Sequence, residues 1–120
     1  MKRTTLVIGA SPNPERYAYK ATIMLQEYGH PVIPYGLKKG SINGAEITAE
    51  LPEQGIDTVT LYVGKQHQQV FYDYLIKLKP SRVIFNPGTE NLELANLLKQ
   101  HQIDPIEACT LVMLRTNQYE

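Results

Sequence analysis

The sequence predicts a single Rossmann-like α/β domain over residues 1–120, with a doubly wound parallel sheet of five strands and helices on both faces. Short apolar or β-branched runs alternate with amphipathic segments of helical period along the chain. The connections between them are short, which is the pattern of parallel strands joined by right-handed helical crossovers. A chain of 120 residues is also long enough to bury one hydrophobic core.

The predicted strands are runs rich in apolar and β-branched residues. They span residues 5–8, 31–35, 58–63, 82–85 and, as the weakest of the set, 105–108. The first run is continuously apolar and ends at Gly9, which is typical of a strand buried on both faces.

The first predicted helix covers roughly residues 16–28, because its apolar side chains recur at steps of three and four. Asn13 and Pro14 are predicted to form its cap and first turn, and Gly29 is predicted to end it. The expected core-facing stripe consists of Tyr17, Ala21, Met24, Leu25 and Tyr28.

Two further helices are predicted over residues 66–79 and 91–101. The first of these ends before Pro80, since proline disfavours helix at the residue before it. Its expected buried side comprises Val70, Phe71, Tyr74, Leu75 and Leu78. Residues 37–52 predict a loop with at most a short helix near its end, and residues 111–114 a C-terminal turn or helix.

Composition narrows the range of functions. The 12 basic and 12 acidic residues cancel, which argues against binding to nucleic acid. The single cysteine, Cys109, cannot form an internal disulfide. No apolar run approaches the roughly 20 residues that cross a bilayer. These features predict a cytoplasmic protein that does not bind membranes.

Ligands of doubly wound sheets bind outside the carboxyl ends of the strands, where the strand order reverses. The first loop at that edge, residues 9–16, can hold a diphosphate on the amides of a helix N-terminus, but it lacks the G-x-G-x-x-G pattern. A helix cap with turn residues explains it equally well. Arg16 favours an anion, because a cation in the first turn opposes the helix dipole unless Glu15 compensates it.

The second loop contains Lys38 and Lys39 and lacks the acidic residue that holds the ribose of NAD. These lysines suit a phosphorylated ribose, as in coenzyme A (CoA) or NADP, although a solvated loop would look the same. The turns Val63-Gly64 and Asn86-Pro87-Gly88 can expose amides to a ligand, or they can be turns only, with Thr89 as the next helix cap.

No catalytic or metal-binding residues are predicted. His30 and His101 lie near helix C-termini, where a positive charge is favoured, and no two histidines have metal-ligand spacing. Cys109 is either a reactive thiol or a small buried side chain.

Residues 6–17, Leu-Val-Ile-Gly-Ala-Ser-Pro-Asn-Pro-Glu-Arg-Tyr, resemble the opening strand and loop of small bacterial CoA-binding domain proteins. That family is similar to the CoA-binding domain of the succinyl-CoA synthetase alpha subunit. Residues 55–61, 86–91 and 107–111 resemble later family segments, although Ile33-Pro34-Tyr35-Gly36 departs from the family's Val-Asn-Pro. The resemblance implies a ligand cradle of Gly9, Ala10, Ser11, Asn13, Arg16, Tyr17, Tyr35, Gly36, Val63 and Gly88.

The resemblance implies non-catalytic binding of CoA or an acyl-CoA, because the synthetase's phosphohistidine lies in a further domain that 120 residues cannot hold. Lys38, Gly64, Asn86 and Pro87 complete the predicted site from the other loops. One alternative is an enzyme that uses NADP or NAD. The other is a regulatory or interaction protein with a vestigial nucleotide crevice, in which exposed tyrosines anchor a homodimer.

Overall fold

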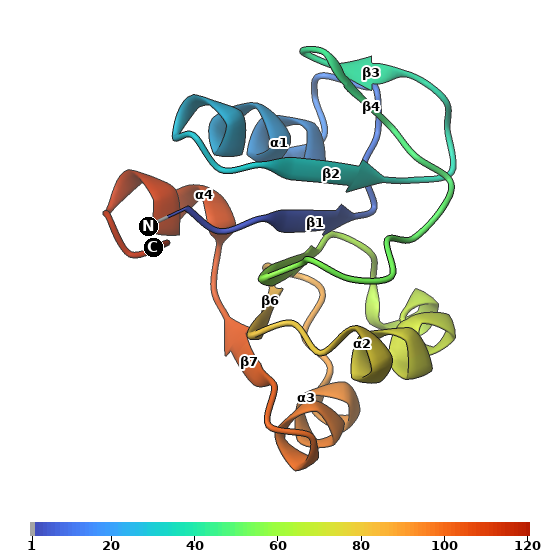
Figure 1. The fold of residues 1–120 in the computed structure, drawn as a ribbon. Helices are drawn as coiled ribbons and strands as arrows, with labels where there is room; N and C mark the ends of the chain where they lie inside the picture. Colours follow the sequence, from blue (N-terminus) through green and yellow to red (C-terminus); the bar gives the residue numbers. More distant parts are fainter. Residues whose placement is uncertain (1) are drawn as a thin grey trace.

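The structure, a computed structural model, describes residues 2–120 and confirms the predicted Rossmann-like α/β fold. The strands of the main sheet are β1 (Thr5–Ile8), β2 (Val32–Tyr35), β5 (Thr58–Leu61), β6 (Arg82–Phe85) and β7 (Asp104–Glu107). All neighbours pair in parallel, in the order β2-β1-β5-β6-β7 (Figure 1). The strand order therefore reverses between β1 and β5, and the carboxyl ends of these two strands form the topological switch point.

Helices cover both faces of this sheet. They are α1 (Tyr17–Glu27), α2 (Tyr72–Leu78), α3 (Leu92–Gln100) and α4 (Thr110–Arg115). The face under α2 and α3 buries Leu6, Val59 and Leu75, and the face under α1 and α4 buries Val7 and Leu25. Because adjacent residues of β1 point to opposite covered faces, the whole strand is buried, as its apolar run predicts. None of the helices in residues 2–120 has the length and apolarity that crossing a bilayer requires.

Residues 37–52 contain a β-hairpin, so the predicted loop with a short helix is wrong. Strand β3 (Ser41–Ile42) pairs antiparallel with β4 (Ala45–Glu46). The two turn residues, Asn43 and Gly44, both have positive φ, at 47° and 87°. That conformation is a type I′ turn, for which Asn-Gly is the preferred sequence. The Asn-Gly dipeptide could have predicted this hairpin, but the flanking strands are too short to show an alternating pattern.

The second predicted helix is broken. Two short 3-10 turns, η1 (Lys65–His67) and η2 (Gln69–Phe71), precede α2. Val70, which was expected in the core, is 82% exposed, whereas Gln68 is completely buried. The helical periodicity of residues 66–79 therefore applies only to α2. Before α2, the side chain that points into the protein is the polar Gln68.

The start of α1 also differs from the prediction. Arg16 is the N-cap residue, so the predicted Asn13-Pro14 cap is wrong. Of the expected core-facing stripe, Ala21 and Leu25 are buried, whereas Tyr17 and Tyr28 are 68% and 40% exposed. The buried face of α1 is completed by Ala18 and Thr22 in place of the two tyrosines.

The amino edge of the sheet holds a buried polar cluster. Arg82, which is 7% exposed, donates from Nε to the Thr58 hydroxyl (2.9 Å) and from Nη2 to the Tyr119 carbonyl (2.6 Å). The Tyr119 and Thr5 hydroxyls share a hydrogen bond of 2.5 Å. This cluster attaches the C-terminal segment to three strands of the sheet, and Figure 1 shows the two termini close together there.

Candidate functional site

Three loops meet at the switch point, and glycines allow their backbones to touch. Gly9 has φ +103°, and a Cβ atom there would lie 3.0 Å from the backbone C and O of Tyr62. A Cβ atom on Gly36 would lie 2.1 Å from the Ala10 carbonyl oxygen. The loops after β1, β2 and β5 therefore pack backbone to backbone, and no larger residue fits at either glycine.

The amides of Gly9 and Ala10 are not available to a ligand. Both donate to the carbonyl of Tyr35, over 3.0 Å and 2.9 Å. Within the predicted loop of residues 9–16, the amides of Gly9 and Ala10 are therefore not among the donors left for a ligand. These residues form the base of the candidate site, and Tyr35 lies beside them at the end of β2.

Side chains satisfy the next backbone donors of the loop. The Asn13 amide donates to the Ser11 hydroxyl (3.1 Å), and the Glu15 amide donates to Asn13 Oδ1 (3.0 Å). Among the hydrogen bonds of residues 2–120, none uses the amide of Ser11 or the first amides of α1. Free donors therefore lie at Ser11 and in the first turn of α1, at the helix N-terminus where the sequence predicts a diphosphate.

Arg16 stands at the start of α1 with an exposed side chain. Within residues 2–120 it forms no ion pair, and Glu15 does not compensate it. A guanidinium at the positive end of a helix is unfavourable by itself, so the arrangement suits a bound anion. Tyr17 follows it, exposed, with Lys20 Nζ lying 5.3 Å from the centre of its ring.

The loop after β2 supplies further cations. Lys38 and Lys39 are exposed, next to Leu37, which is 99% exposed. Tyr35 is half-buried and packs edge-to-face against Phe71, with ring centres 5.9 Å apart. This loop thus presents two exposed positive charges a few residues after Tyr35.

The predicted residues after β6 divide into two kinds. Asn86 is buried, and its amide group donates to the Thr60 hydroxyl (2.6 Å) and the Leu61 carbonyl (2.9 Å) and accepts from the Thr110 amide (2.9 Å). Its side chain therefore joins strands to α4 and has no donor left for a ligand. Pro87 and Gly88 are exposed, and the Gly88 amide donates to Glu90 Oε1 (2.9 Å).

The cap of α3 is Asn91, whose Oδ1 accepts from the Leu94 amide (3.1 Å). The predicted cap, Thr89, instead donates its hydroxyl to the Asn86 carbonyl (2.8 Å). Thr89 therefore stabilises the turn after β6, and the helix begins two residues later than that cap implied.

Two residues at the carboxyl edge of the sheet, Gln68 and Tyr62, were not identified by any pattern in the sequence. Gln68 is buried within the turn after β5 and bonds to neighbouring loops. The hydroxyl of Tyr62 is buried, and among residues 2–120 it has no hydrogen-bond partner. Burial raises the pKa of Tyr62, and the nearby Thr110 and Thr60 hydroxyls offset this only in part.

The ionisable groups at this edge other than cations include one cysteine, one histidine and the exposed carboxylates Glu15, Glu90 and Glu107. Cys109 is half-buried at the N-cap of α4, His67 is exposed in η1, and His30 lies at the opposite edge. No group of histidine, cysteine or acidic side chains within residues 2–120 has the arrangement of a metal site.

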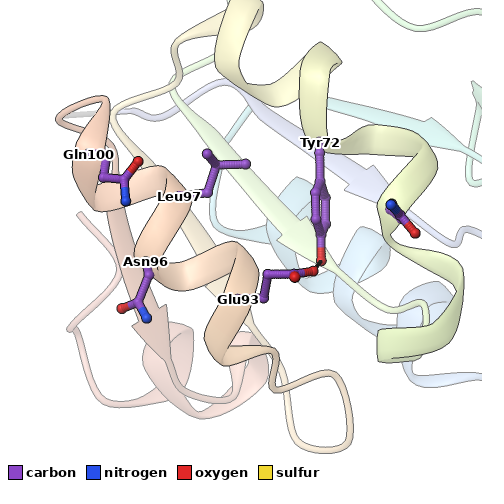
Figure 2. A pocket seen from close by; sticks show the side chains of 6 residues that line it. Tyr72, Glu93, Asn96, Leu97 and Gln100 are labelled. Atoms are coloured by element: carbon purple, nitrogen blue, oxygen red, sulfur yellow. Dashed lines mark hydrogen bonds between the residues drawn. The ribbon is translucent and has the colours of Figure 1, made fainter.

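Two hollows of the surface lie away from the switch point. One, of about 480 Å³, lies between α2 and α3, where Figure 2 shows Tyr72 directed toward Glu93 with Leu97 beside them. The other, of about 310 Å³, lies between α1 and α4 around Ile23 and Leu111. Neither hollow is lined by the predicted site residues, which lie in the loops at the carboxyl ends of β1, β2, β5 and β6.

Comparisons with known proteins agree with this architecture. A family described as a CoA binding domain matches residues 3–115. A solved structure described as an uncharacterized protein is 48% identical, covers 99% of each chain and has a TM-score of 0.96. A comparison with curated proteins found no match.

Two more distant structures share the fold. A protein from Thermus thermophilus is 22% identical over 98% of this chain and 91% of that chain, with a TM-score of 0.86. A hypothetical protein from Pyrococcus horikoshii OT3 is 23% identical over 99% of this chain and 85% of that chain, with a TM-score of 0.85.

Proposed function

This chain belongs to the CoA-binding domain family, and from that premise we propose that it binds CoA or an acyl-CoA at the carboxyl edge of the sheet without catalysing a reaction. The proposed site lies across the switch point between β1 and β5. The observation that carries it is the set of unpartnered donors at the start of α1, namely the Ser11 amide, the first helical amides and Arg16.

These donors fit a diphosphate. Two negatively charged phosphates accept hydrogen bonds from backbone amides at a helix N-terminus, where the helix dipole also favours them. A guanidinium forms paired, charge-assisted bonds with phosphate oxygens. In this proposal Ser11, Arg16 and the first turn of α1, with Tyr17, hold the diphosphate, and Asn13 keeps the loop in shape.

The loop after β2 would hold the nucleoside end. Lys38 suits the ribose phosphate of CoA, and Tyr35 and Gly36 lie beside the base of the candidate site formed by Gly9 and Ala10. Val63, Gly64, Pro87 and Gly88 would line the path of the pantetheine arm, and Asn86, which is buried and fully bonded, would hold the turn beside it.

Binding without catalysis is supported by the kind of groups at this edge. Arg16 and Lys38 suit phosphate recognition, and the Asn86 amide is already fully bonded to the protein. These groups bind and orient a ligand, whereas a transfer reaction needs an acid, a base or a nucleophile beside the reacting atoms.

NADP is the competing ligand, because it also carries a diphosphate and a phosphorylated ribose. The lysines after β2, in the place where an NAD site has an acidic residue, favour either ligand over NAD. The discriminating experiment is a thermal scan of the protein with CoA, acetyl-CoA, NADP and NADH in parallel.

CoA at about 100 times its dissociation constant should stabilise the fold by roughly 2.7 kcal/mol. The affinity should also fall as salt is added, because the proposed contacts are between opposite charges. An unshifted midpoint at millimolar CoA would contradict the proposal, and a preference for NADH would favour the enzyme reading. Mass spectrometry of small molecules that copurify with the protein identifies the acyl group.

We also propose that the protein is cytoplasmic and forms a homodimer. Support for the dimer comes from α1, which exposes Tyr17 and Tyr28, since aromatic residues are enriched at interfaces. Sedimentation over a concentration series tests this, and a monomer at the highest concentration would contradict it.

A further inference from the structure

Gln68 is the most completely engaged polar side chain at the carboxyl edge. It has no exposed surface. Its Nε2 donates to the Val63 carbonyl (3.0 Å) and to the Thr89 carbonyl (2.7 Å), and its Oε1 accepts from Asn91 Nδ2 (2.9 Å). Burying an amide is unfavourable unless it is hydrogen-bonded, and here both donors and the acceptor are used.

The two carbonyls belong to different loops. Val63 follows β5, and Thr89 follows β6 next to Gly88. The backbone pairing of these strands ends at Leu61 and Phe85. Beyond that pair Gln68 connects the two loops, so its side chain continues the link between the strands where the sheet has ended.

Val63 in turn bounds the candidate site. Its Cγ1 lies 3.1 Å from the position that a Cβ atom on Gly9 would occupy. A shift of the Val63 backbone therefore moves the side chain that packs against the first loop. Through Val63 and Thr89, Gln68 determines the separation of the loops after β5 and β6.

We propose that Gln68 is a positioning residue of the CoA site, which holds the loops after β5 and β6 at the separation that the ligand requires. The inference rests on the proposed function, because it assigns Gln68 to that same site. Gln68 acts through Val63 and Thr89 and need not touch the ligand.

The hydrogen-bond network continues outward from Gln68 and supplies a matched control. Asn91 Nδ2 also donates to the Tyr72 hydroxyl (2.9 Å), which donates to Glu93 Oε1 (3.0 Å) at the rim of the α2–α3 hollow (Figure 2). Replacing Tyr72 with phenylalanine removes these two outer bonds and leaves the three bonds of Gln68 in place. A second control, Tyr119→Phe, weakens the amino edge, away from the site.

The test compares CoA affinity and amide hydrogen exchange in the variants. Gln68→Met keeps the length of the side chain and removes its hydrogen bonds. We expect it to bind CoA about tenfold more weakly, and to exchange faster at residues 62–68 and 86–91. Tyr72→Phe and Tyr119→Phe should bind CoA within about twofold of the unaltered protein, whatever their stability.

Asn91→Asp covers the case in which Gln68→Met does not fold. It keeps the cap of α3 and removes the donor to Gln68 Oε1, so we expect a smaller loss of CoA affinity. Faster exchange with unchanged affinity would show a purely structural role and overturn the proposal. Affinity losses that follow stability equally in all variants would also overturn it. Failure of the unaltered protein to bind CoA would instead overturn the proposed function, and this role with it.

Discussion

The amino and carboxyl edges of the main sheet both hold buried, hydrogen-bonded polar groups such as Arg82 and Gln68, but they differ in whether polar groups are also left without partners. At the amino edge, Arg82, Tyr119 and Thr5 are buried and bonded to one another. At the carboxyl edge, the Ser11 amide, the Arg16 guanidinium and the Tyr62 hydroxyl lack partners within residues 2–120. Under the proposed function, the unpartnered groups at the carboxyl edge would bind the ligand, whereas the bonded groups at the amino edge would contribute to stability alone.

Sheet geometry explains this division. In a doubly wound fold each helix after a strand begins at the carboxyl edge, so its free amides and positive dipole end lie there. The amino edge receives the helix C-termini and, in this chain, the C-terminal segment with Tyr119. Substitutions at the two edges should therefore affect different measurements.

Arg82→Met should produce the largest effect, on stability alone. It removes the charged donor from the Thr58 hydroxyl and the Tyr119 carbonyl and the contact with the Tyr119 ring, whose centre lies 4.5 Å from Arg82 Cζ. We expect the free energy of unfolding in urea to fall by about 3 kcal/mol, with CoA affinity unchanged. Arg115→Met, at an exposed arginine, is the control and should change stability by less than about 0.5 kcal/mol. A parallel loss of affinity would remove the distinction between the edges.

Arg16→Ala should show the opposite behaviour. Loss of a charge-assisted bond to phosphate should weaken CoA binding by about 2 kcal/mol, or roughly 30-fold, in titration calorimetry. Stability should stay the same or rise slightly, because the variant removes a cation from the positive end of α1. Equal affinity for CoA would exclude Arg16 from the site.

The fold was largely predictable because the strands are short apolar runs between clear turn residues. Strand β1 and the buried face of α3 follow directly from such patterns. The break before α2 was not predictable, because Gln68 is polar and its burial depends on carbonyls of Val63 and Thr89 that only the folded chain brings together.

The location of the switch point was predictable from the sequence, but the donors that stay free there were not. The switch-point rule places it at the ends of β1 and β5, and the glycines at positions 9 and 36 mark close approaches there. The sequence could not show that the Tyr35 carbonyl accepts hydrogen bonds from the amides of Gly9 and Ala10, since these bonds depend on the register of β1 and β2. Nor could it show that the Tyr62 hydroxyl is buried without a partner, which depends on tertiary packing.

Acid should weaken the amino edge through His30. This side chain is 3% exposed, its Nδ1 accepts from the Arg3 amide (2.9 Å), and its ring packs against Tyr119. Burial, and then the charge of Lys2, lower the pKa of His30 below its usual 6.5, Arg82 acts in the same direction, and Glu120 partly opposes them. The unfolded chain therefore takes up a proton first as the pH falls.

The contribution of His30 to the free energy of unfolding should thus be complete above pH about 6.5. Below that pH it should decline by at most about 1.4 kcal/mol per pH unit for one proton. Urea unfolding between pH 8 and 5 measures the slope, and His30→Phe should flatten it. Asp57 should affect stability only at a lower pH than His30 does. Burial would raise the pKa of this carboxyl, but hydrogen bonds from Thr58, Arg3 and Ser81 hold it below 3.8. An unchanged slope in the variant would exclude His30 as its source.

Tyr62→Phe should give the smallest change and the most specific comparison of the two edges. If the ligand satisfies the buried Tyr62 hydroxyl, its removal should weaken CoA binding by about 1 kcal/mol, or roughly fivefold. The free protein should be as stable as before or slightly more stable, because an unpaired polar group no longer lies buried. Tyr119→Phe is the matched control, since its hydroxyl is bonded to Thr5 and its loss should lower stability and leave affinity unchanged. If Tyr62→Phe instead lowers stability and leaves CoA affinity unchanged, the hydroxyl stabilises the fold. An unpartnered group at the carboxyl edge would then not be sufficient to identify the ligand site.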